Sequence, residues 1–139
     1  MRDLHNSIEI RRAISPTRAT DNTAMVSQII DTANRESLEF VIAIGTVADA
    51  DATFTILVED GAENNLSDNA SVADAFLLGT ESGAAFQFDD DDEVRKIGYI
   101  GMNRYVRLTI TPAANTGNAD ISAVAVLGMA RKGPQSSQT

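Results

Sequence analysis

Hydrophobic and polar residues alternate along much of this chain, which is the pattern of β-strands that bury one face. The alternation is clearest in segment 94–112. Its apolar side carries Val106, Leu108 and Ile110, and its polar side carries Tyr105, Arg107, Thr109 and Thr111. Upstream, Gly98 and Gly101 flank a tight connection in which we expect positive φ. We therefore predict a hairpin that ends at Pro112 and lies at the centre of an all-β domain.

Shorter alternating or apolar runs predict the other strands. They lie at 24–31, 37–45, 53–61, 77–80, 84–88 and 121–128. Segment 24–31 also suits a short helix, because Met25 and Ile29 are four residues apart. Its β-branched residues and the turn signal that follows it favour a strand. Stretch 67–75 predicts one helical turn, capped by Ser67 or Asp68.

Two of these strands are apolar on more than one side. Segment 121–128 is apolar on both faces, which is typical of a central strand or an interface strand. In segment 37–45 the face with Glu39, Val41 and Ala43 is only half polar, so we expect part of it to be covered as well. Both strands are therefore candidates for contact beyond a single sheet.

Short strands separated by turn residues, with little helical periodicity, predict one all-β domain: an antiparallel β-sandwich or small barrel. The 139 residues suffice for a single core. We expect residues 1–20 to form an extended N-terminal arm, 21–130 the sandwich, and 131–139 a flexible polar tail. A frayed terminus is the alternative for residues 1–20.

The arm carries apolar residues that a neighbouring subunit could bury. They are Leu4, Ile8, Ile10 and Ile14. Arg11 and Arg12 lie among them and could reach an acidic neighbour, including another copy of the chain. We expect the arm to lie as an extended segment on such a neighbour. The lone His5 is predicted to be solvated rather than a ligand.

The net charge of −9 is unevenly distributed. Residues 1–20 and the tail each carry +2, so the body between them carries −13. Such a body repels nucleic acid and anionic membranes. No apolar run approaches the roughly 20 residues of a membrane span, and the first residues lack the apolar region of a signal peptide. We expect the protein to be made in the cytoplasm.

The sequence gives little support for catalysis. There is no cysteine, and a Ser/His/acid triad would require His5 to fold back into the body. Gly98 and Gly101 are not followed by the residues of a phosphate-binding loop. Two tyrosines and no tryptophan provide few platforms for a glycosidase. We therefore expect neither an enzyme nor a cofactor, although simple sugar binding stays open.

The acidic run Asp89–Glu93 is the strongest candidate for a Ca²⁺ or Mg²⁺ site, because hard cations need converging carboxylates. Its spacing does not fit an EF-hand, and neighbouring side chains of an extended backbone point to opposite sides. We favour a solvated loop that pairs with Arg95, Lys96 or a neighbour's cations. Asp49 and Asp51 are likewise expected to be solvated, so no metal site is predicted.

Arg104, Tyr105 and Arg107 form a basic and aromatic patch. One interpretation is cross-strand pairing with acidic residues, which stabilises a sheet by a fraction of a kcal/mol per pair, on the order of 0.2–1. The other is a contact patch for a partner protein, in which arginine and tyrosine supply anchors.

Three stretches resemble small proteins encoded beside the major capsid gene of tailed bacteriophages. They are IIDTANRESLEFVI, VADAFLLGTE and the segment YIGMNRYVRLTITP. The resemblance covers nearly the whole chain, although Arg35 and the all-acid run depart from the residues expected there. It implies a head decoration, or cement, protein: a β-sandwich or β-tulip that sits on the outside of an HK97-fold shell and clamps adjacent capsomers.

This resemblance implies the phage major capsid protein as partner and the outer capsid surface of the virion as location. We expect a homotrimer at three-fold positions, with a homodimer at two-fold positions as the alternative. The predicted contact residues are those of the arm and of the basic patch: Leu4, Ile8, Ile10, Arg11, Arg12, Ile14, Arg104, Tyr105 and Arg107. The second hypothesis is a carbohydrate-binding or host-adhesion module on the virion, and the third a hydrolase.

Overall fold

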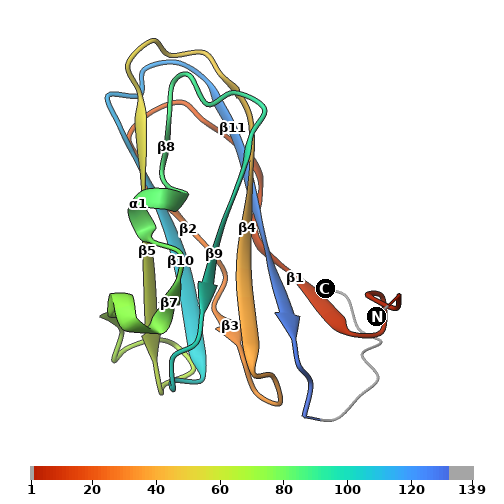
Figure 1. Ribbon diagram of the computed structural model, residues 1–139. Coiled ribbons are helices and arrows are strands. Elements are labelled where there is room, and N and C mark those ends of the chain that lie inside the picture. Colours follow the sequence, from red (N-terminus) through yellow and green to blue (C-terminus); the bar gives the residue numbers. More distant parts are fainter. Residues whose placement is uncertain (1, 132–139) are drawn as a thin grey trace.

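A computed structural model describes residues 2–131. The chain forms one β-sandwich of two antiparallel sheets, as predicted (Figure 1). Sheet A has the order β1-β11-β4-β9-β7, with β1 Ile8–Ala19, β4 Ser37–Val47, β7 Leu77–Leu78, β9 Val94–Tyr99 and β11 Ala119–Gly128. Sheet B contains β2 Met25–Val26, β3 Ile30–Asp31, β5 Thr53–Gly61, β6 Ala70–Ser71, β8 Phe86–Gln87 and β10 Tyr105–Ala113.

The core lies between the sheets and consists of the inward side of each alternating strand. Val106, Leu108 and Ile110 of β10 are fully buried, which confirms the predicted apolar side. β11 is a central strand, with β1 on one side and β4 on the other. Phe54 of β5 stacks on Phe86 of β8 with their ring centroids 4.6 Å apart. This stacking holds the short strand β8 against the long one.

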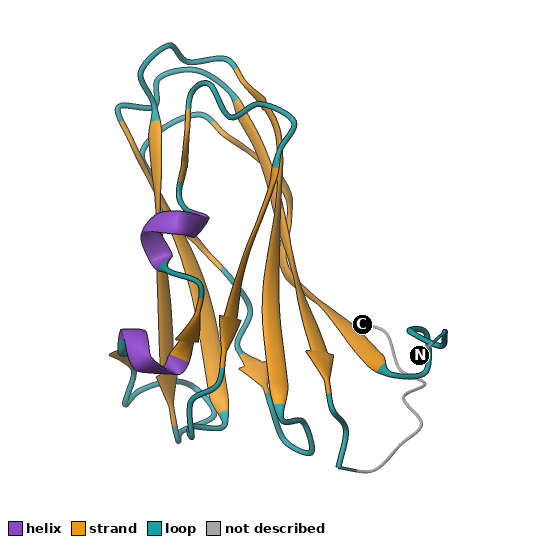
Figure 2. Cartoon of the chain, viewed as in Figure 1, coloured by secondary structure: helices purple, strands orange, loops and turns teal. Residues whose placement is uncertain are grey.

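Helical structure is minor, as Figure 2 shows. It consists of the 3₁₀ turn η1, Asp74–Phe76, and the single-turn helix α1, Glu81–Ala84. The Thr80 hydroxyl caps α1 by accepting a hydrogen bond from the Gly83 N–H. The helical turn predicted at 67–75 is wrong in position, because Ala70 and Ser71 form β6.

The predicted hairpin at 94–112 is also wrong. Both of its strands exist, but β9 pairs with β4 in sheet A and β10 pairs with β5 in sheet B. The connection between them therefore crosses from one sheet to the other. Positive φ occurs at other positions, such as Asn34, and not in the connection 98–103. Alternation identified the strands but carries no information about their partners.

Residues 8–19 do not form an arm outside the sandwich. They are β1, the edge strand of sheet A, and pair with β11 from Ile8 opposite Gly128 to Ala19 opposite Ala119. Two register shifts, between Arg12 and Ile14 and between Ile14 and Thr17, interrupt this ladder. The start of β1 leads away from the two layers toward the labelled N-terminus (Figure 1). Only residues 2–7 precede the sheet among those described.

The strand predicted at 24–31 exists as two short pieces, β2 and β3, on either side of 27–29. β10 extends one residue past Pro112, which is buried and lies opposite Phe54. The predicted flexible tail lies outside the described residues, apart from Arg131. In residues 2–131, no helix has both the length and the apolar character needed to cross a membrane.

Candidate interaction surface

The outward side of sheet A is largely apolar. By strand register it carries Ile8, Ile10 and Arg12 of β1, Ser122, Val124 and Val126 of β11, Glu39, Val41 and Ala43 of β4, Val94 and Lys96 of β9, and Leu78 of β7. We call these residues the outer face. Successive side chains of a strand point to opposite faces, so these residues face outward while their neighbours along each strand point into the core.

Several apolar side chains of the outer face remain in contact with solvent. Val94 is 63% exposed, Leu78 53% and Val124 37%. Val41 and Val126 are half-buried beside Val124. Isolated exposed apolar residues are ordinary on protein surfaces, but a contiguous apolar patch is typical of an interaction site. The sequence indicated this surface through the two strands that are apolar on more than one side.

Glu39 lies within this apolar face. Its carboxylate lies over Gly98, where an added Cβ would be 2.7 Å from Oε2. Burial raises the pKa of Glu39 above the ordinary value of a glutamate, although the nearby Lys96 lowers it. A carboxylate that is already partly desolvated takes up a proton more readily when its surroundings lose more water.

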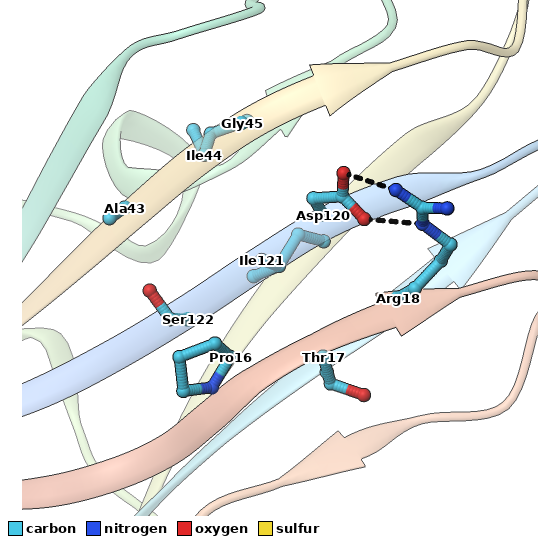
Figure 3. Close-up of a pocket in the computed structure, with 9 residues that line it drawn as sticks. All are labelled: Pro16, Thr17, Arg18, Ala43, Ile44, Gly45, Asp120, Ile121 and Ser122. Carbon is cyan, nitrogen blue, oxygen red and sulfur yellow. Dashed lines mark hydrogen bonds and ion pairs between the residues drawn. The ribbon is translucent and has the colours of Figure 1, made fainter.

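A groove of about 570 Å³ opens at one end of the outer face (Figure 3). Its lining comes from three neighbouring strands of sheet A. The residues are Pro16, Thr17 and Arg18 of β1, Ala43, Ile44 and Gly45 of β4, and Asp120, Ile121 and Ser122 of β11. None of them is aromatic.

The irregularity of β1 is associated with this groove. The second register shift lies between Ile14 and Thr17, next to the groove residues Pro16 and Thr17. A Cβ at Gly45 would be 3.2 Å from the Asp120 Cβ, so a side chain there would crowd β11. Arg18 donates two hydrogen bonds to Asp120, at 2.7 and 2.9 Å, and both residues line the groove.

An ion cluster lies on the inward side of β1. Glu9 is 3% exposed and pairs with Arg11, 2.6 Å away, and with Arg35. Burial raises the pKa of Glu9, but the hydrogen bonds from Arg11 and Arg35 outweigh burial and hold the pKa below its ordinary value. Arg11 also donates to the Asp31 carbonyl at 2.8 Å and so links β1 to β3. Arg11 therefore points inward, although the sequence suggested a contact residue of the arm.

The patch of Arg104, Tyr105 and Arg107 is engaged within the chain. Arg104 donates two hydrogen bonds of 2.8 Å to Asp31 and lies over the Tyr105 ring, 5.1 Å from its centroid. Arg107 lies directly opposite Glu59 in the sheet and donates to it at 3.0 Å. The structure thus shows the cross-strand pairing that was one interpretation of the patch. A contact with another protein stays a prediction.

The acidic run forms a loop that is tied to its neighbours. Asp90 and Glu93 both pair with Arg95, as one interpretation of the sequence expected. Asp90 also accepts a hydrogen bond from the Gln87 N–H at 2.8 Å. Within residues 2–131, no three His, Cys, Asp or Glu side chains come together as a possible metal site.

Asp49 organises the loop between β10 and β11. It accepts hydrogen bonds from the N–H groups of Asp51, Thr116 and Gly117 and from the Thr116 hydroxyl, at 2.8–3.0 Å. These bonds, from Asp51 first, hold the pKa of Asp49 far below its ordinary value. The same carboxylate raises the pKa of Asp51. Asp49 is therefore a structural acceptor rather than a freely solvated side chain.

The predicted contact residues fall into separate groups. Ile8, Ile10 and Arg12 share the outer face, and Leu4 is 65% exposed just before it. Ile14 is 7% exposed and belongs to the core of its own chain. The basic patch lies on sheet B, so it is not part of the outer face. The sequence did not identify the groove or the burial of Glu9, because both depend on which strands become neighbours.

No protein-family model and no curated protein matches the sequence. Among solved structures, the PBSX exported protein XepA has a similar fold, with a TM-score of 0.59 and 11% identity over 99% of this chain. The chain spans 42% of the length of XepA. At this identity the similarity shows the fold alone.

Weaker similarities include modules of plant-polysaccharide enzymes. The CBM22-1–GH10 modules of xylanase 10B from Clostridium thermocellum align with a TM-score of 0.48 and 10% identity over 89% of this chain and 22% of that one. The C-terminal family 22 carbohydrate-binding module of the same xylanase aligns with a TM-score of 0.47 and 8% identity over 94% of this chain and 92% of that one. Scores below 0.5 support no inference about this protein.

Proposed function

We propose that this protein is a capsid decoration, or cement, protein that binds the outside of an HK97-fold phage head and stabilises the contacts between capsomers. The phage major capsid protein is its partner, and the outer surface of the virion is its location. In this proposal the protein acts without catalysis and binds neither nucleic acid nor a membrane. Many copies on one shell add their weak contacts, so each needs only a modest interface.

Two lines of support concern the whole chain. Its sequence resembles small proteins encoded beside the major capsid gene, and its fold is similar to part of XepA, an exported protein of the phage PBSX. The first comparison rests on sequence segments and the second on strand arrangement.

The observation that carries the proposal is the outer face. Val41, Val124 and Val126 lie together there on two adjacent central strands of sheet A. In the monomer Val124 is exposed and Val41 and Val126 are half-buried, while the core is filled by the inward side of the same strands. Burying such apolar area contributes about 25 cal/mol per Å². A rigid strand face of this kind is suited to lie against a protein surface.

The alternative is a carbohydrate-binding or host-adhesion module. Sugar-binding sites commonly combine aromatic side chains with convergent polar groups. The groove beside the outer face has a suitable volume, but its lining of nine residues contains no aromatic ring. The groove therefore favours a protein contact over a stacked sugar, and sugar binding becomes an outcome of the test below.

The test is co-sedimentation of purified protein with expanded phage heads that lack decoration. Val124→Glu puts a charge in the middle of the outer face, and we expect it to weaken binding at least about tenfold, because the charge would lose its hydration under the shell. Thr55→Glu is the matched control, since Thr55 is exposed on the outward side of β5 in sheet B. Both variants should melt close to the wild type.

Equal binding of the wild type and Val124→Glu would remove the outer face from the proposal. If the wild type does not pellet with heads and does not raise their thermal resistance, capsid binding itself is wrong. Retention on host polysaccharide, reduced by substitutions in the groove, would establish the alternative.

A further inference from the structure

Among the described residues, β1 pairs with one strand, β11. Sheet A ends at β1, so the peptide groups of its far side face outward from the sheet. Free edges can pair with another chain, and proteins usually protect them with prolines, bulges, short strands or covering segments. The other edges of this sandwich show such protection. β7, at the other end of sheet A, and β2 and β6, at the ends of sheet B, are each only two residues long.

The second half of β1 is protected in the same way. It contains both register shifts and Pro16. In addition, the Gln28 N–H donates to the Ala13 carbonyl at 3.0 Å, and the Gln28 side chain donates to the Arg12 carbonyl. The segment Ile8–Arg12 comes before the shifts and before Pro16, and its pairing with β11 is regular. Protection thus begins at Arg12, the last residue of this segment, whose carbonyl the Gln28 side chain would release on pairing with another strand.

The sequence of the segment is complementary to itself. In an antiparallel pair of two copies centred on Ile10, Ile8 lies opposite Arg12 of the second copy, and Glu9 lies opposite Arg11 in both directions. Residues that lie directly opposite each other interact, and opposite charges stabilise the pair. Centring the pair on Glu9 or Arg11 instead would place like charges opposite each other, so Ile10 is the favourable centre.

We propose that Ile8–Arg12 pairs with the same segment of a second copy about a two-fold axis at Ile10. The axis is perpendicular to the sheet, and the pairing joins two five-stranded sheets A into one continuous sheet. Glu9 and Arg11 of both copies then lie on the inward side as one ion cluster. Ile8 and Ile10 of both copies lie on the outward side, where they continue the apolar outer face. Of the two assemblies that the sequence left open, this geometry selects the homodimer.

Cysteine cross-linking tests the register, because the chain has no cysteine of its own. Opposite Cα atoms of an antiparallel pair are about 4.5–5.5 Å apart, which suits a disulfide. Ile10→Cys should therefore form a covalent dimer under mild oxidation. Ile8→Cys alone should not, because its copies lie four residues apart along the strand, about 13 Å. A mixture of Ile8→Cys and Arg12→Cys should cross-link, and Thr55→Cys on sheet B is the negative control.

The mass of the full chain in solution, measured by sedimentation equilibrium, should be twice 14.8 kDa. A mass of one or three chains would overturn the proposal, and so would a disulfide in Ile8→Cys as readily as in Ile10→Cys. Both measurements use the free protein, so their failure is distinct from a failure of capsid binding.

Discussion

Glu9 lies on the inward side of β1, where its side chain is buried and its carboxylate pairs with Arg11 and Arg35. Removing one partner of a buried ion pair is costly because the other charge stays buried without compensation. Arg35, at 11% exposure, is that other charge. The stability of this corner of the sandwich therefore depends on Glu9 being ionised.

We predict that Glu9→Gln lowers the free energy of unfolding by about 3–5 kcal/mol at pH 7. Urea denaturation measures this change. Glu36→Gln is the matched control, because Glu36 pairs with Arg131 at 3.1 Å but is 52% exposed, and such a pair contributes about 1 kcal/mol or less. Equal effects of the two substitutions would show that burial of Glu9 does not matter.

The pairing of Glu9 with Arg11 and Arg35 also makes the free energy of unfolding depend on pH. Because the folded pKa of Glu9 lies below its ordinary value, its contribution is complete above the unfolded pKa and is lost as the pH falls through the folded pKa. The difference in stability between wild type and Glu9→Gln should therefore shrink in acid. A difference that stays constant from neutral to strongly acidic pH would contradict the assignment.

The sequence could not predict this cluster. Glu9 and Arg11 lie two apart on one side of a strand, and that side reads as polar and exposed. That side faces the core because β1 pairs with β11 in sheet A. The ion cluster also needs Arg35, which lies 26 residues from Glu9 in the sequence. The ion pairs of Arg104 and Arg107 were easier to predict, since arginines on the polar side of a strand commonly pair with acidic residues on the neighbouring strand.

At the scale of elements, Tyr99 stabilises the connection between β9 in sheet A and β10 in sheet B. It is 4% exposed at the end of β9, and its hydroxyl donates to Asp60 of β5 at 2.6 Å. The hydroxyl also accepts the Asn103 N–H at 3.1 Å. Burial, followed by the Asp60 carboxylate, raises the pKa of Tyr99 above its ordinary value, so the hydroxyl keeps its proton.

We predict that Tyr99→Phe lowers the free energy of unfolding by about 1 kcal/mol, because it removes the hydrogen bonds of the buried Tyr99 hydroxyl to the half-buried Asp60 and to the Asn103 N–H. Amide exchange at Asn103 should become faster. Tyr105→Phe is the control, since Tyr105 is half-buried and its contact with Arg104 is through the ring. Unchanged stability of Tyr99→Phe would mean that other contacts hold the crossing.

The strands themselves were predictable, and their partners were not. Period-two alternation marks β4, β5, β10 and β11, because each buries one side against the core. The same alternation in β9 and β10 predicted a hairpin, since closeness in sequence favours pairing. The structure separates them, because a sandwich also connects its two layers through short crossings. β1 was taken for an arm because its bulges and Pro16 break the pattern that marks the other strands.

At the scale of the whole molecule, the proposed surfaces belong to one layer. The outer face and the open start of β1 are both features of sheet A, whereas sheet B ends in the two-residue strands β2 and β6. Joining two sheets at Ile10 would make their outer faces one platform. Two linked contacts on one shell bind more tightly than either contact alone.

If the outer face binds a shell as proposed, Glu39 would make that binding sensitive to pH. Burial already raises its pKa, and Lys96 of β9 is the charged group that opposes this effect. Covering the outer face with a shell would remove more water from the carboxylate, so the bound state would favour the protonated form. We predict that affinity for heads rises as the pH falls from 7 to 5, by at most about tenfold per pH unit for one proton.

Glu39→Gln should bind more tightly than the wild type at pH 7 and should remove this part of the pH dependence. Co-sedimentation isotherms at several pH values, with the exposed Glu63→Gln as control, measure the effect. The comparison at each pH cancels any titration of the heads themselves. Parallel pH profiles for wild type and Glu39→Gln would show that the shell does not cover Glu39, and the contact would then have to lie elsewhere on the molecule.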